Sequence, residues 1–254
     1  MEEPGSLELG LSTALGFTDS AGRFIGGWTE VEYGVKGWWT TEFYLQGQNS
    51  AGQGSAFTGY RWENRFRPLL REHWINPVVY VEFENANGAD RSFKEVVGHD
   101  SKLDLLEPIS TARSEKEREF ETKLILSSNF RGWNVAENFI AVKNVRHEPW
   151  EFGYALGISR PLALAASANE CRFCRENFVA GLELYGGLGE WGTFGLQGTS
   201  HYLAPSLAWQ LQSGTTLRIS PTFGLPSLSV PFMVRFGISH EIGGFSRQVR
   251  EWFR

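Results

Sequence analysis

Aromatic and charged residues alternate between Thr58 and Pro68, and this pattern restricts the fold more than any other feature of the chain. The charged set is Arg61, Glu63, Arg65 and Arg67, and Trp62, Asn64 and Phe66 lie between its members. Successive side chains of a β-strand point to opposite faces, so this segment has one apolar face and one ionic face. Similar alternation recurs along almost the whole chain, without a separate set of helices to cover the apolar faces. A closed barrel that turns its apolar side outward fits this pattern best.

The composition is compatible with a membrane barrel and excludes a transmembrane helix. Hydrophobic residues make up 41% of the 254 residues, and the mean hydropathy is -0.27. No run of about 18 apolar residues exists, which a membrane-spanning helix would need. Alternation dilutes the apolar signal of a membrane strand by half, so a low mean hydropathy does not argue against a barrel.

The charge balance and the first residues bear on partners and location. The formal net charge is -5, from 24 Lys+Arg against 29 Asp+Glu, so no nucleic-acid partner is indicated. Met1–Pro4 lacks the charged and apolar regions of a signal peptide. An outer-membrane protein is exported, so on this interpretation the signal has been removed. The alternative is a cytosolic protein that never had one.

The alternation divides the chain into about twelve candidate strands, most of them close to the ~9–11 residues that a tilted membrane strand needs. In these candidate strands, every second residue is mainly apolar. Examples are the segments Leu7–Phe17, Val31–Val35, Val79–Phe83, Phe120–Leu126, Phe152–Ile158, Phe178–Leu184 and Phe232–Ile238. The segment around Val135–Lys143 is ambiguous in parity. We therefore predict an all-β fold: a closed antiparallel transmembrane β-barrel of about twelve strands, with residues 1–254 forming a single domain.

Loop lengths give an orientation, because outer-membrane barrels have short periplasmic turns and long external loops. With a periplasmic N-terminus, the longest connection, Asn85–Arg118, is external, although Arg160–Arg175 is long for a periplasmic turn. Within the external loop, Asp90–Arg118 either folds inward as a constriction or stays solvated. Residues 243–254 form a C-terminal amphipathic tail, predicted to be a short helix at the membrane interface or across the periplasmic mouth, or else a frayed end.

Tryptophans near the predicted strand ends are expected to form girdles where hydrocarbon meets headgroups, because the indole ring is apolar and its N–H can stay wet. This set is Trp28, Trp38, Trp39, Trp133, Trp150 and Trp209.

The inward charges are the first candidates for function. The residues predicted to line the lumen and set its selectivity are Arg61, Glu63, Arg65, Arg67, Glu82, Glu84, Glu121, Lys123, Arg218 and Arg235. In a barrel of about twelve strands, opposite charges on neighbouring strands can reach each other. Two interpretations remain open: the network fills and rigidifies the lumen, or it faces a water-filled path and sorts small solutes by charge.

Cys171 and Cys174 are the two cysteines, and they are expected to form a local disulfide that holds a long turn in an oxidising periplasm. No histidine follows Cys174, so c-type haem attachment is not indicated, and a second cysteine pair for a zinc site is lacking. A redox-active dithiol is the alternative. No cofactor or metal is expected.

An enzyme is not expected, although some outer-membrane barrels are lipid hydrolases. Ser200-His201 begins a predicted strand, and His99-Asp100-Ser101 lies in the long loop. Nucleophilic catalysis needs a serine, a base and an orienting group that meet in space, whereas adjacent strand residues point apart.

Several strand sequences resemble a family of bacterial outer-membrane barrels, the transporters of the phenol-degradation meta-pathway type. The matching segments are Glu32–Val35, Glu121–Ser127, Glu151–Tyr154, Gly181–Leu184 and Ala204–Leu207. The resemblance implies an outer-membrane β-barrel that takes up small, often aromatic molecules, and it supplies no catalytic residues. Many such barrels end on a terminal aromatic residue within the last strand, whereas this chain continues from Ile242 to Arg254.

The sequence therefore predicts an outer-membrane pore in contact with the lipid bilayer, for passive uptake of small solutes through a charged lumen. One alternative is a non-conducting barrel that serves as a structural or docking element for a protein partner in the outer membrane or periplasm. Another is a soluble lipocalin-like binder, which would need the parity inverted.

Overall fold

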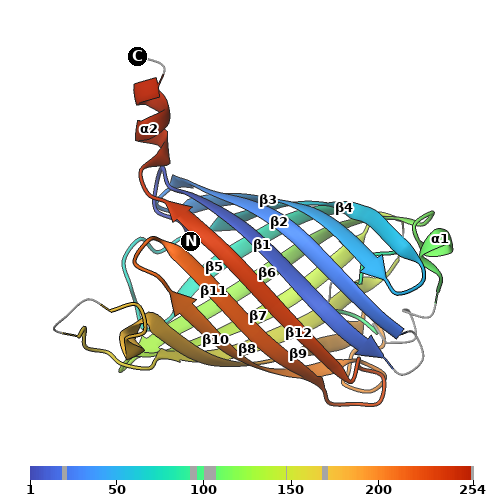
Figure 1. The fold of residues 1–254 in the computed structure, drawn as a ribbon. Helices are drawn as coiled ribbons and strands as arrows, with labels where there is room; N and C mark the ends of the chain where they lie inside the picture. Colours follow the sequence, from blue (N-terminus) through green and yellow to red (C-terminus); the bar gives the residue numbers. More distant parts are fainter. Residues whose placement is uncertain (19–21, 92–95, 100–106, 147, 168–170, 253–254) are drawn as a thin grey trace.

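The computed structural model describes residues 1–18, 22–91, 96–99, 107–146, 148–167 and 171–252. Within this part of the chain, twelve antiparallel strands close into one barrel (Figure 1). They are β1 (Leu7–Thr18), β2 (Gly22–Lys36), β3 (Trp39–Ser50), β4 (Gly54–Phe66), β5 (Asn76–Asn87), β6 (Lys116–Phe130), β7 (Trp133–Asn144), β8 (Trp150–Pro161), β9 (Phe178–Glu190), β10 (His201–Gln210), β11 (Thr215–Gly224) and β12 (Phe232–Ile242). Each strand pairs with its neighbours in sequence, and β1 pairs with β12 to close the sheet. The predicted fold class and strand number are confirmed.

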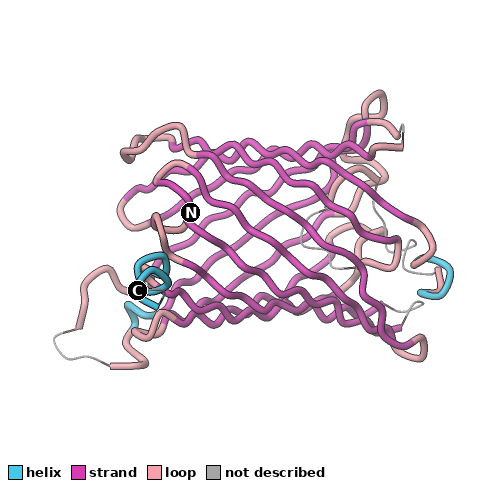
Figure 2. The backbone as a smooth tube through the Cα atoms, turned by 90° about the horizontal axis from the view of Figure 1, so that it is seen from above, coloured by secondary structure: helices cyan, strands magenta, loops and turns pink. Residues whose placement is uncertain are grey.

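The barrel has two mouths, which we name after the helix found at each. The α1 mouth holds the 88–115 connection with α1 (Ile109–Ala112), and the α2 mouth holds the chain start, the 162–177 connection and α2 (Phe245–Trp252). The strands cross the wall at a tilt, with helices and loops confined to the two ends (Figure 2). A 3-10 turn, η2 (Arg175–Asn177), precedes β9. In the described residues, neither helix is long and apolar enough to cross a bilayer.

The outer wall is apolar and the inner wall is polar. On β4, Trp62 is 52% exposed, whereas the adjacent Glu63 is 0% exposed and points into the barrel. Leu9 and Leu11 on β1, and Phe236 and Ile238 on β12, are likewise exposed. The lipocalin-like alternative required the reverse arrangement and is wrong.

Strand β7, whose parity was ambiguous in the sequence, turns Val135, Glu137 and Phe139 outward and buries Ile140 and Val142 inside. The ambiguity has a simple cause, because β7 carries apolar residues on both faces. A glutamate therefore lies on the outer wall, while two branched apolar side chains face the lumen.

Of the six tryptophans predicted to form girdles, all but Trp28 lie at or beside a strand end. Trp38 and Trp39 stack near the α2 mouth, with ring centroids 6.2 Å apart. Trp28, by contrast, lies inside the barrel in the middle of β2, where it is buried and its indole N–H donates to Glu30 Oε2 at 3.1 Å. Trp28 was expected near a strand end, but β2 begins at Gly22, well before the predicted start of this strand.

The C-terminal tail forms α2, as its apolar spacing predicted, up to Trp252. Ser246 N donates to Gly5 O at 3.0 Å, which fixes the start of the helix to the N-terminal segment. From there α2 projects away from the barrel (Figure 1), so it does not lie across the mouth.

Candidate functional site: the barrel lumen

A dense ionic network covers one side of the lumen, and Arg65 lies at its centre. This arginine on β4 pairs with Glu42 Oε2 on β3 at 2.8 Å and Glu32 Oε1 on β2 at 3.4 Å. It also contacts Glu63 on its own strand. The Tyr44 hydroxyl donates to Glu63 Oε2 at 2.7 Å. One cation therefore serves three carboxylates, an arrangement that the fork of guanidinium donors allows.

A second cluster lies nearer the α1 mouth and is built around Arg61. Its Nε is 3.1 Å from Glu84 Oε1 and donates to Gln46 Oε1 at 2.6 Å. Arg61 Nη1 is 3.7 Å from Glu82 Oε1, and Glu82 also accepts a 2.6 Å hydrogen bond from the Tyr80 hydroxyl.

Lys123 on β6 extends this cluster. Its ammonium is 2.7 Å from Glu121 Oε1 and lies 3.9 Å from the centroid of the Tyr80 ring. Cation–π contact of this kind is favourable where water is scarce.

The opposite side of the lumen is lined mainly by small side chains. Its inward residues include Ser12, Ala136, Ala155, Gly157, Ser206, Ser220 and Gly237. Arg235 on β12 is the main ionic group there, and it pairs with Glu183 Oε2 at 3.0 Å. Its guanidinium also lies over the Tyr185 ring. Large charged side chains on β2–β6 thus project toward a wall of small ones.

A cavity of about 490 Å³ remains between these two sides. Its glutamates are Glu8, Glu30, Glu32, Glu42 and Glu183, and its arginines are Arg65, Arg218 and Arg235. Acidic groups therefore outnumber basic ones along this cavity.

The described residues 88–91 and 96–99 of the long connection lie in the α1 mouth, as the inward-folded alternative for this segment predicted. On one side, Asp90 accepts hydrogen bonds from Gln46 and Thr58, and Arg91 N donates to Gln48 Oε1 at 2.9 Å. On the other side, Gly98 pairs with Gly189 of β9 and donates to Phe152 O.

Between these anchors, Val96 is buried in an apolar cluster with Phe24, Tyr185, Tyr202, Ala204, Val230 and Met233. We call the described residues 88–91 and 96–99, together with this cluster, the α1-mouth cover. The cover narrows the mouth above the lumen cavity.

At the α2 mouth the chain start tucks against the inner face of β2. Gly5 N donates to Gly34 O at 2.7 Å, and a Cβ built on Gly34 would lie 2.0 Å from Glu3 O, so only glycine fits there. Glu2 is placed beside three other acids. Burial, together with the charges of Glu32, Glu241 and Glu8, raises the pKa of Glu2 to about 7.

The predicted lumen residues are all located, but they do not form one row. Arg61, Glu63, Arg65, Glu82, Glu84, Glu121 and Lys123 belong to the two clusters on the charged side, whereas Arg218 and Arg235 lie on the small side. Arg67 belongs to neither, because it follows the end of β4 and donates to Gly37 O in the β2–β3 turn at 2.8 Å. A role for it in selectivity is not supported.

Sequence reasoning missed the polar partners that organise the charges. Tyr44 and Tyr80 lie on the inward parity of their strands, so their spacing could have identified them as members of the network. Asp90 and Val96 had no such signal, because they lie in a loop and their partners are distant in sequence.

The serine–histidine motifs are placed apart from the lumen. His201 lies on the outward parity of β10, with Nδ1 3.0 Å from the Tyr154 hydroxyl and Nε2 2.9 Å from Thr199 Oγ1. His99 lies 3.1 Å from Thr193 Oγ1, while Asp100 and Ser101 fall outside the described residues. Among the residues described, no three His, Cys, Asp or Glu side chains are grouped to hold a metal ion.

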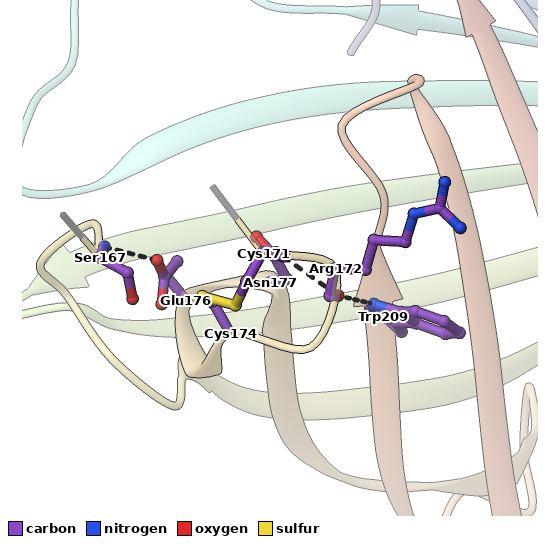
Figure 3. Close-up of a disulfide and its surroundings, with 7 residues drawn as sticks. All are labelled: Ser167, Cys171, Arg172, Cys174, Glu176, Asn177 and Trp209. Carbon is purple, nitrogen blue, oxygen red and sulfur yellow. Dashed lines mark hydrogen bonds between the residues drawn. A yellow bond between two sulfur atoms is a disulfide. The ribbon is translucent and has the colours of Figure 1, made fainter. Parts of the chain in front are cut away.

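Cys171 and Cys174 form a disulfide, as predicted (Figure 3). The surrounding turn is held by further bonds: Asn177 Nδ2 donates to Cys171 O at 2.8 Å, and Trp209 Nε1 donates to Arg172 O at 2.8 Å. The disulfide therefore closes a local turn, and the hydrogen bond from Trp209 attaches this turn to β10.

Comparison with known proteins gives the fold. No family model and no curated protein matches the chain. Among solved structures, the chain is similar to the COG4313 outer membrane channel from Pseudomonas putida F1, with a TM-score of 0.58, 10% identity, and coverage of 95% of this chain and 97% of that one. It is also similar to the KdgM porin, with a TM-score of 0.54, 7% identity, and coverage of 92% and 98%. At such identities, the likeness establishes an outer-membrane-type barrel.

Proposed function

We propose that the protein is an outer-membrane channel for small solutes, with a lumen that prefers cations to anions. The observation that carries this proposal is the cavity of about 490 Å³ between the charged and the small sides of the barrel, under an outer wall of exposed apolar side chains. Such a barrel is stable only when lipid covers its outside and polar groups fill or line its inside.

Two similarities support this proposal. The solved structures with the same architecture include a porin and a channel. The strand sequences resemble transporters of the phenol-degradation meta-pathway type, and from this we take small, often aromatic molecules as the solute class.

Reversal potentials across planar bilayers under a KCl gradient test the selectivity. The double variant Glu8→Gln/Glu30→Gln removes two carboxylates from the cavity and is expected to lower the ratio of K⁺ to Cl⁻ permeability. Glu137→Gln is the matched control, because Glu137 lies on the outer wall. An unchanged ratio in the double variant would show that the cavity does not lie on the conducting path.

A second candidate is a non-conducting barrel that docks a partner in the outer membrane or periplasm. The α1-mouth cover favours it, because buried contacts of Asp90, Val96 and Gly98 narrow one entrance. Correctly inserted protein without any conductance would support this candidate over the first.

A further inference from the structure

The wall of the barrel has a seam between β10 and β11 where the hydrogen-bond ladder is interrupted. Cross-strand pairing runs through Leu203–Phe223 and resumes only at Leu207–Ile219. In this register Pro205 lies directly opposite Pro221. Three residues on each strand are unpaired, and the flanking pairs lie about 14 Å apart along the strand.

The backbone hydrogen bonds that the two prolines cannot donate belong to the same interface, the one between β10 and β11. Pro205 pairs in register with Leu182 of β9, and Pro221 pairs with Val234 of β12. The β9–β10 and β11–β12 ladders therefore continue past the two prolines. Backbone groups of alternate residues in an antiparallel strand point to alternate neighbours. Proline has no N–H, and both missing donors fall in the β10–β11 interface. Elsewhere in sheets, proline is confined mainly to edges and bulges, so two facing prolines give a closed barrel an internal edge.

The inner face of the seam opens on the lumen cavity. Ser206 and Ser220, which flank the two prolines, line that cavity. The Ser220 hydroxyl is buried and lacks a hydrogen-bond partner in the described residues, and the Thr222 hydroxyl interacts with Tyr185 of β9, so neither side chain bridges the interruption. The α1-mouth cover, through Ala204 and Tyr202, lies immediately beyond the seam.

The outer face of the seam borders an apolar groove of about 540 Å³. Its lining residues include Leu207, Trp209, Leu217, Ile219, Phe236 and Ile238. Arg218, Phe236 and Gly237 line both this groove and the lumen cavity, so one layer of strand separates them. The interrupted part of the ladder therefore lies next to the place where an apolar groove and the cavity approach each other, with Leu207 and Ile219 between them.

We propose that the β10–β11 seam is a lateral portal through which compact apolar molecules pass between the lumen and the bilayer. The portal rests on the proposed channel function and specifies its route. The α1-mouth cover narrows the axial entrance. Separation of β10 from β11 at the two prolines, where the strands share no hydrogen bonds, opens a side path. Uncharged, largely apolar molecules are the class that fits, because they partition into lipid and into the groove.

Site-specific labelling tests the portal. Asn138→Cys places a thiol in the lumen cavity, while the native cysteines remain unreactive in their disulfide. In proteoliposomes, N-pyrenylmaleimide reaches this thiol from the bilayer, and a charged methanethiosulfonate reaches it from water. Pro205→Val/Pro221→Val restores two ladder hydrogen bonds and is expected to slow pyrenylmaleimide labelling roughly tenfold, with the aqueous reaction unchanged.

Two controls make the result specific. Gln210→Val/Thr216→Val alters the same interface where the ladder is already intact, at positions outside the groove and the cavity, and labelling should stay at the original rate. If the proline variant fails to insert, an oxidised Ala204→Cys/Thr222→Cys pair clamps the seam instead, and Gly181→Cys/Ser206→Cys clamps the neighbouring β9–β10 ladder as its control.

The outcomes separate the portal from the channel. Pyrenylmaleimide labelling that is equally fast with the seam restored or clamped would overturn the portal, whatever the conductance. Loss of the aqueous reaction in every variant, together with absent conductance, would instead overturn the channel function.

Discussion

At the residue scale, the lumen charges are held by contacts with several partners rather than by isolated pairs. Glu63 is 0% exposed and is bonded by Tyr44 and Arg65, while Arg65 is shared among three carboxylates. Burial of a carboxylate is costly unless such partners compensate. The network therefore stabilises the barrel as well as shaping its lumen, and the two interpretations offered by the sequence are compatible.

Arg65→Met should destabilise the barrel, because it leaves three carboxylates facing each other without a cation. We expect a loss of about 2–3 kcal/mol in the free energy of unfolding, less than for a dry site because Arg65 retains partial contact with the cavity. Urea titration in lipid bilayers, followed by tryptophan fluorescence, measures it. Arg23→Met on an exposed strand end is the control, and an equal loss there would refute the special role of Arg65.

The raised pKa of Glu2 makes stability depend on pH at the α2 mouth. Its folded pKa of about 7 exceeds the ordinary value of 4.5, so the folded state holds this proton more tightly than the unfolded state. That contribution is fully present below pH 4.5 and is lost as the pH rises through about 7. Glu2→Gln should therefore melt at a higher temperature than the wild type at pH 8 and at the same temperature at pH 4.

Glu3→Gln, at an exposed neighbouring position, provides the control for this melting comparison. If Glu2→Gln showed no advantage at pH 8, Glu2 would have to be solvated in the folded protein.

At the element scale, strands were predictable and connections were not. Period-2 alternation identified the strands because each has one lipid face and one lumen face, and only β7, apolar on both, was ambiguous. The inward position of residues 88–91 and 96–99 depends on partners such as Gln46, Thr58 and Gly189. No local pattern encodes contacts between residues so far apart in sequence. The sequence contains Pro205 and Pro221, but only the strand register shows that they face each other and interrupt the β10–β11 ladder.

Loosening the α1-mouth cover should widen the axial path. Asp90→Gly/Arg91→Gly removes the carboxylate that accepts from Gln46 and Thr58 and the guanidinium that donates to Ser50 Oγ and Glu107 O. Single-channel conductance is expected to increase roughly twofold. The matched control Leu196→Gly/Gln197→Gly, at exposed positions in a different connection at the same mouth, should have little effect. Equal conductance in both variants would mean that the cover lies off the conducting path.

At the scale of the whole molecule, the decisive property is the inversion of polarity between wall and lumen. The sequence was sufficient to predict it, together with closure and strand number, because alternation repeats around the entire barrel. It could not divide the lumen into a charged side on β2–β6 and a small side opposite. That division arises when the closed sheet brings distant strands face to face.

Phe43→Arg tests the lipid-facing assignment of the outer wall. Phe43 is 43% exposed in the middle of β3, and an arginine at mid-membrane depth on a barrel costs about 2–4 kcal/mol. Equilibrium unfolding in bilayers measures the change. Leu196→Arg, in a connection beyond the strands, should cost much less. A similar small cost at both positions would contradict the placement of β3 in lipid.

The conductance of the purified wild-type protein in a planar bilayer tests the central claim most directly. The account predicts discrete, cation-selective current steps from protein whose folded barrel is verified by its heat-dependent shift in gel mobility. Folded, inserted protein that carries no current, and that does not admit aqueous reagents to Asn138→Cys, would contradict a solute-conducting lumen.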